Sequence, residues 1–108
     1  MTVHYSDTFK RQLKRLSRKY RHIRSDVQPL IEQLEAGETP GEQIQGAGYP
    51  VYKARLANTD AQRGKSGGYR AIYYLKQQDY ILLVTLYSKT EQSDVEAKEI
   101  TQIIQGEE

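Results

Sequence analysis

The chain has 108 residues, which is enough for one hydrophobic core and too few for two domains of ordinary size. It contains no cysteine, so disulfide bonds and thiolate chemistry are excluded, and 16 Lys and Arg against 14 Asp and Glu leave a net charge of +2. No apolar run is long enough to span a membrane and no signal peptide is evident, so we expect a single domain over residues 1–108, in the cytoplasm.

The N-terminal quarter predicts a short strand followed by a basic helix. Residues 2–5 can form the strand, and Asp7 can cap the helix. Apolar residues then recur at intervals of three and four and form one helix face. They are Phe9, Leu13, Leu16, Tyr20 and Ile23. The other faces of this helix are crowded with Lys and Arg.

A second helix is predicted to begin near Ser25, which forms a capping-box pattern with Gln28. Pro29 then falls in the first turn, where its missing N–H is tolerated, and Gly37 marks the end of the helix. Apolar residues follow the spacing of one helix face between these limits. The two helices therefore predict an antiparallel helical hairpin.

After a loop rich in Gly, Pro and Gln, the pattern changes to that of β-strands. The predicted strands are residues 51–56, 69–75 and 80–87. Side chains alternate along a strand, so Lys53 and Arg55 share one face of the first. The connection at residues 58–67 is polar and contains glycine, and we expect it to be mobile and exposed. Residues 81–87 are apolar throughout, which is typical of a central strand covered on both faces.

The last segment predicts a short amphipathic helix. Ser93 and Glu96 form another capping-box pattern, and apolar residues from Ala97 onward have helical spacing. The order β-α-α-β-β-β-α predicts an α+β fold, with two N-terminal helices packed on a mostly antiparallel sheet and a short C-terminal helix.

The charges are segregated along the chain. Residues 1–24 carry eight Lys or Arg and one Asp, whereas residues 25–48 carry five acidic residues and no Lys or Arg. Residues 49–89 are again basic and residues 90–108 again acidic. Such segregation lets a domain of small net charge present strongly basic surfaces, which favours a polyanionic partner. A solvated helix face is the alternative explanation for any one charge run.

Three stretches carry a resemblance to a known family. They are Tyr-Lys-Ala-Arg-Leu at 52–56, GKSGGYRAIY at 64–73 and LYSKTEQSDV at 86–95. Together with the order of elements, they resemble the RelE/HigB group of the RelE/ParE superfamily of bacterial type II toxins over nearly the whole chain. The pairing of residues 65–70 with residues 87–89 resembles the HigB-like branch.

The resemblance implies a small RelE-like (microbial RNase-like) fold and a ribosome-dependent mRNA endonuclease. Such an enzyme cleaves translated mRNA without a metal or other cofactor and is neutralised by a cognate antitoxin. Consistent with this, the two histidines are far apart, and no group of His, Asp and Glu has metal-ligand spacing. We therefore expect no metal and no membrane partner.

The resemblance carries catalytic roles to Lys53 and Arg55 on one strand, to Arg70 on the next and to Lys89 beyond the last. The planar guanidinium of Arg70 could hold phosphate oxygens with two parallel hydrogen bonds. The glycines before it would let the backbone approach RNA. Further contacts with RNA or the ribosome are expected from Arg63, Lys65, Tyr87, Lys10, Lys14 and Arg18. For the last three, a solvated helix face remains the alternative.

The groups that move protons are not assigned by the resemblance. Cleavage by attack of a ribose 2′-hydroxyl on the adjacent phosphate needs two proton transfers and stabilisation of negative charge. In well-known RelE members a tyrosine of the last helix and an arginine after the final strand contribute, but Glu96 and Thr90 occupy those positions here. Glu91, Glu96 or a lysine crowded by other cations could serve instead.

Two other functions stay open. A ParE-like inhibitor of DNA gyrase would share the scaffold and act by binding, and a non-catalytic RNA-binding or repressor module would use only the basic surfaces. Cations clustered on the face of the sheet favour the nuclease, since a nuclease site would lie there.

Overall fold

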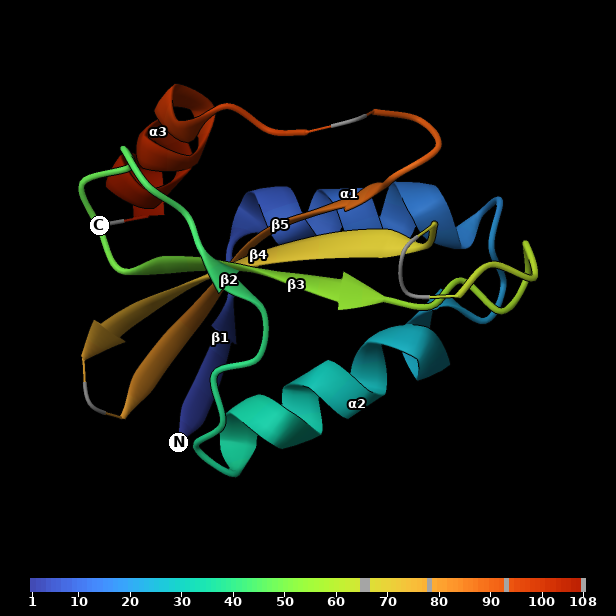
Figure 1. Cartoon of the computed structure of the whole chain (residues 1–108), viewed down its shortest axis with the longest axis horizontal. Helices are drawn as coiled ribbons and strands as arrows, with labels where there is room; N and C mark the ends of the chain where they lie inside the picture. The colour runs from blue at the N-terminus through green and yellow to red at the C-terminus, as the bar shows by residue number, and fades with distance from the viewer. Residues whose placement is uncertain (65–66, 78, 93, 108) are drawn as a thin grey trace.

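The computed structural model describes residues 1–64, 67–77, 79–92 and 94–107 (Figure 1). Its elements are β1 (Thr2–Tyr5), α1 (Asp7–Ser17), α2 (Ile23–Glu35), β2 (Glu42–Gln43), β3 (Val51–Leu56), β4 (Tyr69–Gln77), β5 (Tyr80–Ser88) and α3 (Ala97–Glu107). The strand order is β1-β5-β4-β3-β2, and each pair is antiparallel except β1 with β5. The predicted α+β fold is therefore confirmed, with β2 as an additional short strand.

The sheet separates two layers of apolar side chains. Both α1 and α2 pack on one face, where their buried residues join Ala54, Tyr69 and Leu83. Helix α3 packs on the other face, together with Val51 and Leu82. Figure 1 shows α1 and α2 running in opposite directions and α3 lying near the start of β3. Strand β5 contributes buried side chains to both layers, which confirms the prediction of a doubly covered central strand.

The start of α1 is capped by Ser6 and not by Asp7, so the prediction is wrong by one residue. The Ser6 hydroxyl accepts the N–H of Phe9 at 2.9 Å and donates to the carbonyl of Val84 at 2.6 Å. Ser6 is fully buried, so one side chain both caps the helix and ties it to β5. Asp7 is the first helical residue, where its negative charge still favours the helix N-terminus.

The boundary between the two helices also differs from the prediction. Helix α1 ends at Ser17, so Tyr20 lies in the connecting turn, and α2 already begins at Ile23. Ser25 therefore lies inside α2 and does not cap it, and Pro29 lies in its interior instead of its first turn. The end of α2 is as predicted. Gly37 has φ +88°, its N–H bonds the carbonyl of Leu34, and the next N–H bonds the carbonyl of Gln33.

The connection after β3 contains a hydrogen-bonded turn over residues 58–63, and its residues 59 and 61–64 are exposed, as predicted. Asn58 is buried and exchanges both backbone hydrogen bonds with Arg63 at 2.9 Å. Asp60 accepts the backbone N–H of His22 at 2.7 Å, and its other oxygen lies 2.7 Å from His22 Nδ1. The N-cap residue of α2 is therefore His22 and not Ser25, and the Asp60 carboxylate satisfies the backbone N–H of His22 from a later turn.

Candidate active site

The predicted catalytic cations of the sheet lie on its α3 face. Lys53 and Arg55 alternate with Ala54 and Leu56, which belong to the layer under α1 and α2. The register pairs Arg55 with Arg70 and Arg70 with Tyr87, so these three side chains form one row across β3, β4 and β5. The structure therefore brings together four of the residues that the sequence singles out.

This row lies toward the end of the sheet opposite Val51, and its members Arg70 and Tyr87 are buried, Tyr87 in the same cluster as α3. The buried residues of α3 join a cluster that includes Val51, Tyr74 and Leu82, which form the row at the opposite end of the three strands. In Figure 1 the segment between β5 and α3 returns along the same face toward α3. The site is thus bounded by the sheet below, α3 at one end and residues 89–92 and 94–96 along one side.

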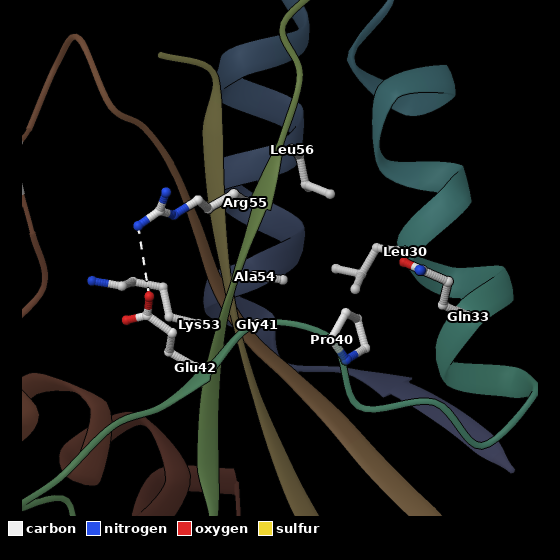
Figure 2. Close-up of a pocket in the computed structure, with 9 residues that line it drawn as sticks. All are labelled: Leu30, Gln33, Pro40, Gly41, Glu42, Lys53, Ala54, Arg55 and Leu56. Carbon is white, nitrogen blue, oxygen red and sulfur yellow. Dashed lines mark ion pairs between the residues drawn. The ribbon is translucent and has the colours of Figure 1, made fainter. Parts of the chain in front are cut away.

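Figure 2 shows Lys53, Arg55 and Glu42 pointing to the same side of β3, away from Leu30 and Ala54. Arg55 Nη2 lies 3.6 Å from Glu42 Oε1, and both side chains are largely exposed. A pocket of about 220 Å³ at this edge of β3 reaches from α2 to residues 40–42. The free protein therefore covers one cation of the site with a carboxylate from the edge strand.

Gly41 allows the edge strand to lie this close. Its φ is +97°, and a Cβ atom there would lie 2.1 Å from the carbonyl oxygen of Lys53. Only glycine fits both the conformation and the contact. A larger residue at position 41 would prevent β2 from pairing with Lys53 and Tyr52 of β3, which explains one of the glycines in this loop.

Arg70 is 5% exposed, and its Nη1 donates to the carbonyl of Tyr69 at 3.2 Å. A buried guanidinium on a central strand is held in place, which suits a group that must meet a phosphate in a defined position. Its positive charge also acts on Tyr87. Burial raises the pKa of the Tyr87 hydroxyl to about 12, the charge of Asp94 adds to the rise, and Arg70 opposes it. Tyr87 is therefore a hydrogen-bond donor at neutral pH.

Asp94 is a site residue that the sequence reasoning missed. Its Oδ1 accepts the backbone N–H of Val95 at 2.9 Å and the Tyr87 hydroxyl at 3.4 Å, and it lies 3.7 Å from Lys53 Nζ. The Val95 N–H lowers the pKa of this carboxyl most, and the charge of Lys53 lowers it further against the effect of burial. Asp94 lies in an irregular segment, so no helical or strand spacing marks it in the sequence.

The two acidic residues predicted as proton-transfer groups have different surroundings. Glu91 lies 3.4 Å from Arg15 Nη1 on α1. Glu96 is exposed and directly precedes α3, which begins at Ala97. The capping box predicted for Ser93 and Glu96 is therefore wrong, because Glu96 would have to lie within the first turn of the helix. Ser93 itself is outside the described residues.

The glycine-rich approach to β4 has a structural reason. A Cβ atom on Gly68 would lie 2.0 Å from the carbonyl oxygen of Leu56, and the Gly68 carbonyl accepts the N–H of Lys89 at 2.9 Å. Gly68 therefore allows the backbones of β3, β4 and the end of β5 to lie close together, and this packing role does not depend on any contact with RNA. Arg63 and Lys89 are exposed nearby, whereas Lys65 lies outside the described residues.

The basic residues of α1 form a separate surface. Arg11, Lys14, Arg15 and Arg18 line one hollow along the helix. Lys10 lies instead at the seam between α1 and α2. Because α1 packs on the other face of the sheet, Lys14 and Arg18 are across the sheet from Lys53 and Arg70. The three predicted helix cations are thus exposed, but they do not join the sheet site.

Two structural findings bear on possible partners. Within residues 1–64, 67–77, 79–92 and 94–107, no three acidic or histidine side chains are grouped so that they could hold a metal ion. In the same part of the chain, no helix has the length and apolar character needed to cross a membrane.

A comparison with protein families finds that residues 6–105 match the family described as the RelE toxin of the RelE/RelB toxin–antitoxin system.

Proposed function

We propose that this chain, which belongs to the RelE toxin family, is a ribosome-dependent mRNA endonuclease of the HigB-like branch. The family is that of type II toxins, so the chain is a toxin with a cognate antitoxin as partner. The observation that carries the proposed activity is the row formed by Arg55, Arg70 and Tyr87, with Lys53 beside it, on the α3 face of the sheet.

The row suits the charge distribution of the reaction. When a ribose 2′-oxygen attacks the adjacent phosphorus, negative charge grows on the phosphoryl oxygens and on the leaving 5′-oxygen. Arg55 and Arg70 can each present two N–H groups to these oxygens, and Lys53 adds a third positive charge two residues along β3. Preorganised cations of this kind stabilise the transition state without moving, which is most effective for buried Arg70.

Single-stranded RNA is the substrate class that the site favours. The side chains of Arg55 and Lys53 are 55% and 26% exposed, and Tyr87 places a hydroxyl donor at the end of the row. In the proposal, the ribosome delivers the mRNA to this face in the cytoplasm. The exposed cations of α1, Lys14 and Arg18 among them, support docking to ribosomal RNA on the opposite side, since phosphate contacts are made chiefly by Lys and Arg.

The test is primer extension on a defined mRNA in a reconstituted translation system, with and without ribosomes. Wild type is compared with Lys53→Ala and Arg70→Ala, and Lys98→Ala serves as the control because Lys98 is an exposed lysine of α3. We expect ribosome-dependent cuts in wild type and Lys98→Ala, and a loss of about 10²-fold or more in each site variant.

Intact mRNA with wild-type protein would contradict the nuclease. Ribosome binding without cleavage would then indicate a non-catalytic RNA-binding module. Inhibition of DNA supercoiling by gyrase in a parallel assay would indicate the ParE-like function.

A further inference from the structure

We propose that Asp94 is the general base of this site and accepts the proton of the attacking 2′-hydroxyl. The inference rests on the proposed nuclease function and adds to it the proton acceptor that the sequence left open. It is carried by geometry: one carboxylate lies between the cation of β3 and the hydroxyl at the end of the Arg55, Arg70 and Tyr87 row.

The carboxylate is held in place on one side and open on the other. Its contacts among the described residues, with the Val95 N–H, the Tyr87 hydroxyl and Lys53 Nζ, are all made by Oδ1. The side chain is nevertheless 65% exposed, so Oδ2 can be reached by a substrate. An oriented carboxylate that stays exposed is the arrangement that general-base catalysis needs.

Two other groups near the row, Glu91 and Tyr87, fit this role less well. Glu91 is directed to Arg15 on α1. Tyr87 keeps its proton at neutral pH because burial raises its pKa to about 12, so it can donate but cannot accept the proton. Asp94 remains ionised at neutral pH, since the Val95 N–H and Lys53 lower the pKa of its carboxyl.

In the proposed cleavage step, one bond to phosphorus forms as another breaks, and two protons are transferred. The 2′-oxygen forms a bond to phosphorus while its proton passes to Asp94 Oδ2, and the bond from phosphorus to the 5′-oxygen breaks. The leaving 5′-oxygen takes a proton from water. The products are a 2′,3′-cyclic phosphate and a 5′-hydroxyl, and Asp94 returns its proton to solvent. Tyr87 and Lys53 position the carboxylate throughout.

Asp94→Asn is the most informative variant. An amide oxygen at the position of Oδ1 can still accept hydrogen bonds from Val95 and Tyr87, so the change removes basicity and charge with little change in shape. We expect single-turnover cleavage on the ribosome to fall by about 10²- to 10⁴-fold. Binding to ribosomes carrying an mRNA with a 2′-deoxyribose at the cut position should change less than threefold, since that RNA has no proton to give.

Three controls make the result specific. Glu99→Gln removes an exposed carboxylate of α3 and should cleave at the wild-type rate. Glu91→Gln and Glu96→Gln test the two acidic residues that the sequence left open for this role, and retention of activity in both supports Asp94. A urea unfolding curve for each variant establishes that it is folded.

The outcomes separate this assignment from the function on which it rests. If wild type cleaves and Asp94→Asn cleaves within threefold of it, Asp94 is not the base and the nuclease stands. If Asp94→Asn loses binding as strongly as cleavage, the residue serves docking and the assignment is again wrong. If wild type cuts no transcript, the nuclease function and this assignment fail together.

Discussion

Arg55 on β3 and Arg70 on β4 are directly opposite each other in the sheet, so two guanidinium side chains leave neighbouring strands on the same face. Like charges in such a pair destabilise a sheet by about 0.2–1 kcal/mol. Glu42 lies 3.6 Å from Arg55 and offsets part of this repulsion in the free protein. A pair of like charges that opposes folding is expected in a site for an anionic substrate, because the bound anion interacts favourably with both arginines.

The first prediction isolates that repulsion. In a Glu42→Gln background, Arg55→Gln should raise the free energy of unfolding by about 0.2–1 kcal/mol, because it removes only the interaction with Arg70. Urea unfolding at low ionic strength measures the change, and 1 M NaCl should reduce it through screening. A lower free energy of unfolding at low salt would show that Arg55 stabilises the sheet.

The second prediction concerns Glu42 as a competitor of RNA. Glu42→Gln frees Arg55 from its ion pair, so the affinity for a short single-stranded RNA should rise. The rise should be at most about fivefold, because an exposed ion pair contributes at most about 1 kcal/mol. Fluorescence anisotropy with an RNA that lacks 2′-hydroxyls measures binding alone. Glu38→Gln, an exposed carboxylate change at the end of α2, should have a smaller effect. Equal affinities for Glu42→Gln and wild type would show that the pair does not compete.

The third prediction concerns the contact between Asp60 and His22. The backbone N–H of His22 lowers the pKa of Asp60 most, followed by its side chain. A carboxyl whose pKa is lower in the folded state stabilises the fold above its unfolded pKa and loses that effect as the pH falls through the folded value. Asp60→Asn should therefore unfold at lower urea than wild type at pH 7, and the difference should shrink below about pH 4.

A suitable control for this measurement is Asp79→Asn, an exposed aspartate in the turn before β5. Its unfolding midpoint should stay near wild type across the same pH range. A difference for Asp60→Asn that persists unchanged at pH 3 would mean that the carboxylate charge is not its source.

The fourth prediction concerns Gly41. Gly41→Ala places a Cβ atom against the carbonyl of Lys53 at a positive φ, so the free energy of unfolding should fall by about 1–3 kcal/mol. Gly106→Ala is the matched control. It lies in α3 with open space around its position and should raise the free energy of unfolding by up to about 1 kcal/mol. Thermal or urea unfolding distinguishes the two, and a Gly41→Ala variant as stable as wild type would contradict the clash.

Much of the site could be predicted from the sequence because strand geometry is local. Alternation along residues 51–56 places Lys53 and Arg55 on one face without knowledge of the neighbours. The pairing of Arg55 with Arg70 and of Arg70 with Tyr87 needed the register of three strands. That register includes a bulge near Ile72, where the pairing shifts by one residue, and nothing in the local pattern marks it.

The sequence by itself determined the order of elements, the face on which the cations lie and the end of α2, where Gly37 has the backbone freedom that a helix stop requires. Tertiary structure alone brought Asp60, in a later turn, to the backbone N–H of His22 at the start of α2. It also brought Asp94 to Lys53 and Tyr87. Periodicity reports short-range geometry, whereas a contact between segments far apart depends on how the whole chain packs.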